Sequence, residues 1–118
     1  MTEQNKKPYD LEERTFLFAK RTNDYINKLP RTITNIENGR QLARSAGSIG
    51  ANYIEANESL SKKDFIMRAK ISKKESKESR FWLNLTEPRQ ENLIEKESLI
   101  KESTELMKIL GAILEKSK

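Results

Sequence analysis

Apolar residues recur every three or four positions through most of the chain, and this pattern is interrupted at three points. Such spacing places side chains on one face of an α-helix, whereas a half-buried strand would show strict alternation. Two interruptions fall at Pro30 and Pro88, because proline lacks an amide hydrogen and disfavours helical geometry in the residue before it. The third lies at residues 58–61. The pattern therefore predicts four helices and no strand.

Capping residues support these boundaries. Asp10 precedes the first periodic stretch, and Ser61 with Asp64 forms a capping box before the third. The predicted helices cover residues 10–29, 34–57, 61–87 and 91–115. Because every connection is short, neighbouring helices should be antiparallel, which is the up-down-up-down order of an all-α four-helix bundle. We expect one domain over residues 10–116, preceded by a flexible segment at residues 1–9.

The helical period also predicts the core. The inward-facing residues should be Leu11, Thr15, Phe18, Thr22, Tyr25, Ile26 and Leu29 on the first helix; Leu42, Ala46, Ile49, Tyr53, Ala56 and Leu60 on the second; Phe65, Ser72, Ser76, Ser79 and Leu83 on the third; and Leu99, Ile100, Ser103, Met107, Leu110 and Leu114 on the fourth. Phe16 and Leu17 fall off the first of these faces. They are either loosely exposed or in contact with another subunit.

The stretch "RSAGSIGANYIEAN", from Arg44 to Asn57, has almost no bulky side chains. Its "GSIG" matches the GxxG loop of KH domains, which clamps a nucleic-acid backbone, but that fold needs strands. The lysine and serine or threonine of a Walker-type phosphate loop are absent. The helical period instead predicts a helix whose Gly47 and Gly50 permit close approach of another backbone. The serine-rich third helix is the expected neighbour.

The composition argues against catalysis. The chain has no cysteine and no histidine, which removes disulfides, thiolate metal sites and the commonest general base. Glu75 and Glu78 form a pair of carboxylates without a base partner or a metal-competent cluster, so we expect no catalytic residues, no metal and no cofactor. The polar N-terminus is not a signal peptide and no apolar run approaches a membrane span, which favours a soluble, cytoplasmic protein.

The net charge of +5 is concentrated in one part of the chain. Residues 61–90 carry nine basic and four acidic side chains, a net charge equal to that of all 118 residues. The basic residues form a stripe along the third helix, to which two arginines of the second helix could add. The predicted nucleic-acid-binding residues are Arg40, Arg44, Lys63, Lys70, Lys73, Lys74, Lys77 and Arg80. A stripe of cations that follows the phosphates would bind RNA or DNA with little sequence preference. The alternative interpretation, which the sequence supports equally, is an ordinary solvated outer face.

Two other features of the third helix need an explanation. Phe81 lies on the basic side, where it could stack on a base, although a subunit contact is the preferred interpretation. Arg68 and Glu75 point inward, and an internal ion pair or network with Glu55 or Asn52 is the simplest account.

The segments "YDLEERTFLFAKR", "LPRTI", "QLARSAGSIGANYIEANES" and "SKKDFIMRAKISKKESKESRFWL" resemble the four-helix-bundle proteins of the 23S ribosomal RNA intervening-sequence family. The resemblance extends from Tyr9 to Leu114. It implies ring-like homopentamers with a positive surface, which would place Phe16, Leu17 and Phe81 at subunit contacts. It also implies a relation to the nucleic-acid-binding accessory proteins of diversity-generating retroelements. It supplies no catalytic residues.

Two functions remain open at this point. The first is a non-enzymatic, oligomeric bundle that binds RNA or DNA through phosphate contacts. The second is a protein-interaction scaffold or accessory subunit whose basic face binds an acidic protein such as a reverse transcriptase.

Overall fold

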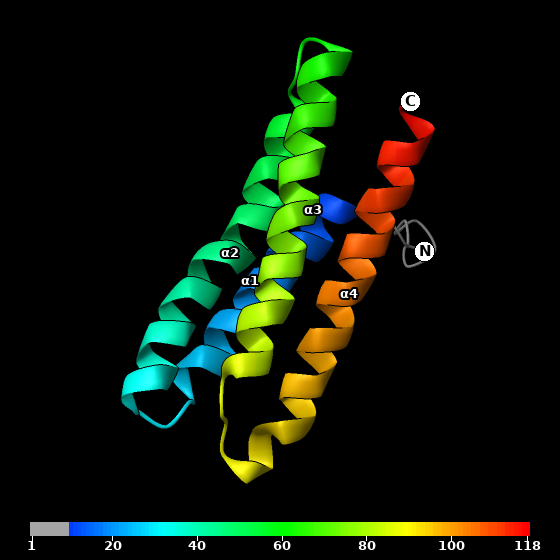
Figure 1. Ribbon diagram of the computed structural model, residues 1–118. Coiled ribbons are helices and arrows are strands. Elements are labelled where there is room, and N and C mark those ends of the chain that lie inside the picture. Colours follow the sequence, from blue (N-terminus) through cyan, green and yellow to red (C-terminus); the bar gives the residue numbers. More distant parts are fainter. Residues whose placement is uncertain (1–9) are drawn as a thin grey trace.

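The computed structural model describes residues 10–118, which form four helices and a short 3₁₀ turn (Figure 1). They are α1 (Leu11–Asn27), α2 (Ile33–Asn57), α3 (Lys62–Leu85), η2 (Gln90–Asn92) and α4 (Leu93–Lys116). No strand occurs within this part of the chain. Successive helices pack against one another, and α4 also contacts α1. The all-α prediction is confirmed, and the packing fits the predicted bundle. The predicted flexible segment, residues 1–9, lies outside the described residues.

Three of the four helices, α1, α2 and α3, begin at a residue whose side chain caps them. Asp10 accepts a hydrogen bond from the amide of Glu13 at 3.5 Å, and Ser61 accepts one from Asp64 at 3.1 Å. A cap that was not predicted, Thr32, accepts from Asn35 at 3.1 Å and starts α2 one residue early. The predicted first helix is two residues too long, because α1 ends at Asn27, in keeping with the backbone restriction that Pro30 imposes. The third helix ends at Leu85 rather than residue 87, since Thr86 is extended.

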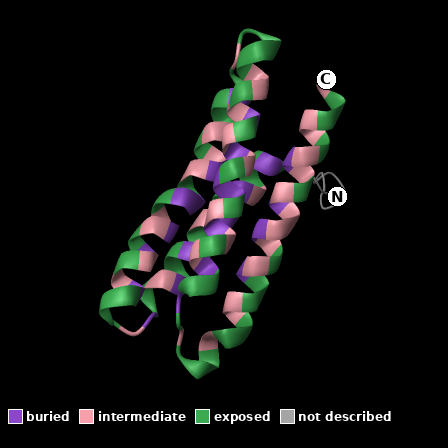
Figure 2. Cartoon of the chain, viewed as in Figure 1, coloured by how far each residue is buried: buried purple, intermediate pink, exposed green. Residues whose placement is uncertain are grey.

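The predicted core is largely confirmed. Figure 2 shows the buried residues where the helices face each other and exposed residues on the outward faces and at the helix ends. The largest fully buried side chains include Phe18, Tyr25, Leu42, Ile49, Leu83, Leu99 and Leu110. Leu60 was predicted inside and is fully exposed, because it lies beyond the end of α2 in the turn to α3. Leu106, which was not predicted, is fully buried.

Serine side chains join α2 to α3. Ser45 Oγ lies 2.9 Å from Ser79 Oγ, and Ser72 Oγ donates to the carbonyl oxygen of Ile49 at 2.8 Å. All three serines are fully buried. Small side chains let the two helices approach closely, and the hydrogen bonds satisfy polar groups that would otherwise be costly to bury. The prediction of a closely packed α2–α3 pair is therefore supported, although serines make the contact and the glycines do not.

The two interior glycines of α2 have different surroundings. A Cβ added at Gly50 would lie 2.8 Å from Thr15 Oγ1 and 3.3 Å from Thr15 Cβ, whereas one added at Gly47 would meet nothing within 4 Å. Gly50 thus permits close packing against α1, and not against α3 as predicted. The prediction of a close approach at Gly47 is wrong within the described chain. "GSIG" lies in the middle of a helix, which removes the KH-loop interpretation.

Asn35 links the two connections at one end of the bundle. Its Nδ2 donates to the carbonyl oxygens of Pro30 and Glu87, each at 3.0 Å, and its Oδ1 accepts from the Glu87 amide at 2.9 Å. Nearby, Tyr25 Oη lies 2.7 Å from Thr86 Oγ1 in a buried hydrogen bond. These contacts fix the turn after α1 to the turn after α3.

Candidate nucleic-acid interface

Four lysines project from the outward face of α3. Their side chains are exposed, because the opposite face of the helix is buried through Ala69, Ser72, Ser76, Ser79 and Leu83. These four are Lys63, Lys70, Lys74 and Lys77; Lys62, at the first position of the helix, is also exposed. Their spacing of three, four or seven residues places them along one side of a helix. The structure therefore keeps these four predicted residues on a common face.

Lys73 and Arg80, two further predicted residues, lie at the edge of α3 that packs against α4. Arg80 Nη1 donates to Thr104 Oγ1 at 3.3 Å. A Cβ added at Gly111 of α4 would lie 3.6 Å from Lys73 Nζ. Both side chains are half-buried. They therefore carry the positive charge from the outer face of α3 toward α4.

Two lysines of α4 continue this charge. Lys101 and Lys108 are exposed. Lys101 lies three residues before Thr104, which accepts the hydrogen bond from Arg80. Lys108 lies three residues before Gly111, which is close to Lys73. Residues three apart are neighbours on a helix surface. We define the cationic surface as the set of Lys63, Lys70, Lys73, Lys74, Lys77, Arg80, Lys101 and Lys108. The sequence prediction did not include Lys101 and Lys108, because residues 91–118 have a net charge of −1. A net charge does not show on which side of a helix each charged residue lies.

Three of the five acidic residues of α4 contact α1 or its C-cap. Arg14 Nε binds Glu102 Oε2 at 2.6 Å, and Arg14 Nη2 binds Glu105 Oε1 at 2.7 Å. Lys28 Nζ pairs with Glu95 Oε1 at 2.7 Å. The hydrogen bond that Arg14 donates to Glu102 raises the pKa of Arg14 above its ordinary value, so the guanidinium stays charged. α4 therefore presents three of its carboxylates to α1, whereas Glu97 is exposed four residues before Lys101.

The α3 cations have no comparable partners. Among the described residues, the remaining ion pair joins Lys118 to Glu115, and no ion pair includes a member of the cationic surface. Uncompensated positive charge along two adjacent helices creates a potential that attracts polyanions. The arrangement is suited to phosphate binding.

Arg40 and Arg44 are exposed on α2, on the other side of α3 from α4. Arg44 Nη2 donates to Gln41 Oε1 at 3.3 Å. The two arginines add positive charge beside α3, but the structure shows no contact between them and the lysines.

The three residues predicted at subunit contacts are all exposed and lie on two different helices. The exposed fractions of Phe16 and Leu17 on α1 are 61% and 47%, and that of Phe81 on α3 is 57%. The Phe81 ring makes a T-shaped contact with Trp82, with ring centroids 5.0 Å apart. Exposure is compatible with the predicted contacts, and Phe81 lies among the α3 lysines.

The inward polar residues of α3 behave differently from one another. Arg68 Nη1 donates to Asn52 Oδ1 at 3.2 Å, as predicted. Glu75 is 7% exposed, and its Oε1 has no hydrogen-bond partner within the described chain, so the predicted ion pair or network for this carboxylate is not found. Neither Glu75 nor Glu78 belongs to a metal-competent cluster in residues 10–118.

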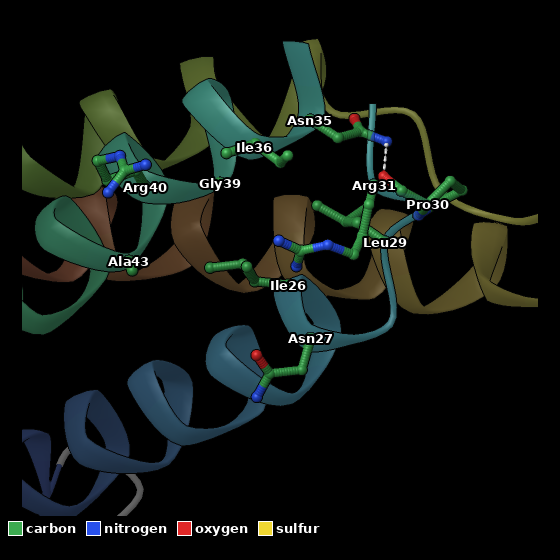
Figure 3. A pocket seen from close by; sticks show the side chains of 10 residues that line it. All are labelled: Ile26, Asn27, Leu29, Pro30, Arg31, Asn35, Ile36, Gly39, Arg40 and Ala43. Atoms are coloured by element: carbon green, nitrogen blue, oxygen red, sulfur yellow. Dashed lines mark hydrogen bonds between the residues drawn. The ribbon is translucent and has the colours of Figure 1, made fainter. Parts of the chain in front are cut away.

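A cavity of about 310 Å³ lies between the end of α1 and the first half of α2 (Figure 3). Ile26, Leu29 and Ile36 line it with apolar groups, while Arg31 and Arg40 supply cations. No carboxylate or hydroxyl group lines it. The cavity thus lacks an acid–base pair for catalysis.

No helix in the described part of the chain is long and apolar enough to cross a membrane.

The fold and the cationic surface define a small helical-bundle protein with a face suited to polyanions. The chain belongs to the 23S rRNA-intervening sequence protein family, whose model matches residues 8–112. It is also similar to a solved structure from Bacteroides thetaiotaomicron, described as a protein with unknown function from the S23 ribosomal protein family. The two chains are 31% identical with a TM-score of 0.74, over 87% of this chain and 96% of the other. No curated protein matches the chain.

Proposed function

We propose that this protein is a non-enzymatic, antiparallel up-down-up-down four-helix bundle that binds RNA or DNA through phosphate contacts with the cationic surface. The observation that carries the proposal is the row of exposed lysines on α3, none of which forms an ion pair within the described chain. On α4, Glu95, Glu102 and Glu105 are bound to cations of α1 and its C-cap, so these three carboxylates do not neutralise the α3 lysines.

Assembly would strengthen such binding. The family resemblance implies a homopentamer, and Phe16 and Leu17 are the residues we propose at its subunit contacts. A ring that presents the same surface several times gains avidity without any new contact. The expected ligand is a polyanion, such as RNA, that is bound with little sequence preference.

The test reverses four charges on the cationic surface. A variant with Lys70, Lys73, Lys74 and Lys77 changed to Glu should lose binding to labelled RNA and DNA while its helical circular dichroism is unchanged. The matched control reverses four exposed cations elsewhere, namely Lys20, Arg31, Arg89 and Lys116. Both variants have the same net charge, so a nonspecific charge effect would weaken them equally.

Equal binding by the two variants would contradict the proposal, as would wild-type affinity that does not fall with salt. Each phosphate contact should contribute about −0.7 to the slope of log K against log salt for a single strand, or about −0.9 for B-DNA.

A protein scaffold is the second candidate, favoured by the exposed apolar side chains of Phe16 and Leu17. In that case the cationic surface would bind an acidic protein, such as a reverse transcriptase. Capture of the same partner with and without nuclease treatment separates the two functions, because a nucleic-acid bridge would be destroyed.

A further inference from the structure

Phe81 has an exposed ring at the C-terminal end of the row of exposed lysines on α3. Lys77 precedes it by one helical turn and Lys74 by two, and all three side chains are exposed. Residues four apart on a helix have Cβ atoms about 5–6 Å apart. Packing within the chain does not explain this position, because the ring is 57% exposed. The surroundings of Phe81 therefore point to an external group that is both flat and close to negative charge.

The ring is held in place from one side. Its contact with Trp82 is T-shaped, with an interplanar angle of 79°, and Trp82 is itself half-buried against the core. A T-shaped contact leaves at least one face of the Phe81 ring uncovered, and such edge-to-face pairs are themselves stabilising. The ring thus has an aromatic neighbour on one side and is open to a ligand on another.

We propose that the cationic surface binds single-stranded nucleic acid, with one base stacked on Phe81 and the neighbouring phosphates along the lysines. This inference rests on the proposed nucleic-acid binding and names its ligand class. A duplex keeps its bases stacked inside, whereas a single strand can turn one base out onto an aromatic ring. Lys70 and Lys77 are seven residues apart, or about 10 Å along the helix axis, and Phe81 lies one turn beyond Lys77, so the backbone of a short strand can follow the lysines up to Phe81.

The surrounding charge favours this ligand over a second copy of the chain at Phe81. A subunit contact centred on Phe81 would remove Lys74 and Lys77 from water, and burying unpaired charges is costly. A strand of nucleic acid supplies both the ring for stacking and the phosphates that neutralise the lysines.

The experiment replaces Phe81 with Leu, which keeps apolar bulk but removes the aromatic ring, and with Tyr, which keeps the ring. The control is Ile33→Leu, since Ile33 is an exposed apolar residue that lies on α2. The probes are fluorescein-labelled RNA and DNA single strands of about 12 nucleotides, which lies within the range bound by single-strand proteins, and a duplex of the same length. Anisotropy titrations at several salt concentrations give affinity and salt slope, and light scattering gives the oligomeric state.

We expect Phe81→Leu to weaken single-strand binding by roughly 5- to 150-fold, the loss of one stacked base. The salt slope should stay the same, because no phosphate contact is removed. Phe81→Tyr and Ile33→Leu should bind like the wild type, and the mass of the assembly should not change.

Wild-type affinity in Phe81→Leu, a loss of its assembly mass, or a preference of the wild type for the duplex would each overturn the stacking inference while leaving the proposed function intact. Failure of the wild type to bind any of the probes would overturn both.

Discussion

The two glycines of α2 provide a matched pair for testing how tightly α1 packs on α2. Replacing a helical glycine with alanine stabilises a helix by about 1 kcal/mol, and this gain applies to both positions. At Gly47 the new methyl group meets nothing within 4 Å, whereas at Gly50 it would lie 2.8 Å from Thr15 Oγ1. Thr15 cannot easily move, because its hydroxyl donates to the Leu11 carbonyl oxygen at 2.6 Å.

Gly47→Ala should therefore raise stability by about 1 kcal/mol, or roughly 4 °C in melting temperature. Gly50→Ala should lose this gain to overpacking, which costs about 1–3 kcal/mol. Because the helix-propensity terms cancel, the difference between the variants measures the overpacking alone.

The measurement is urea unfolding followed by circular dichroism, at one protein concentration so that any assembly contributes equally. A third variant combines Gly50→Ala with Thr15→Ala, and it should be more stable than the sum of the two single changes predicts, because the contact with Oγ1 is gone. If Gly50→Ala is as stable as Gly47→Ala, the close packing of Thr15 on Gly50 is refuted.

Two further predictions concern the polar contacts between the connections. Asn35→Ala should lower the free energy of unfolding by about 2–4 kcal/mol, because three hydrogen bonds to Pro30 and Glu87 are lost. The midpoint of urea unfolding measures this change, and a midpoint equal to that of the wild type would contradict it. Burial raises the pKa of Tyr25 above its ordinary value of 10.0, although the hydrogen bond with Thr86 opposes the shift. The folded state therefore holds the phenolic proton to higher pH than the unfolded state, and this contribution to stability is lost as the pH rises above about 10. Tyr25→Phe should be less sensitive to alkaline pH over that range, as comparison of the two unfolding curves between pH 9 and about 12 would show.

The sequence was sufficient for the features that depend on local spacing. Proline positions and capping side chains place the helix ends within about two residues, and the 3.6-residue period identifies buried positions such as Phe18 and Leu99. Leu60 fails because periodicity continues past the end of a helix, whereas the chain at that point has already turned. Local patterns cannot show where a helix stops facing the core.

The features that depend on helix docking could not be predicted in the same way. Whether Gly50 meets α1 or α3 depends on how α2 is rotated against both neighbours. Similarly, the contact of Arg80 with Thr104 follows from the docking of α4, which also directs Glu102 toward Arg14. These relations are between helices, and no spacing within one helix encodes them.

The sorting of charge on α4 also determines how the protein should respond to ionic strength. Salt screens the attraction of Arg14 for Glu102 and Glu105, which loosens the contact between α1 and α4, but it equally screens the mutual repulsion of the lysines on the other flank. The two effects oppose each other in the free energy of folding. Binding of a polyanion has no such compensation, since every contact with the cationic surface weakens. A steep decline of binding with salt would therefore report the ligand contacts themselves, with little contribution from unfolding of the bundle.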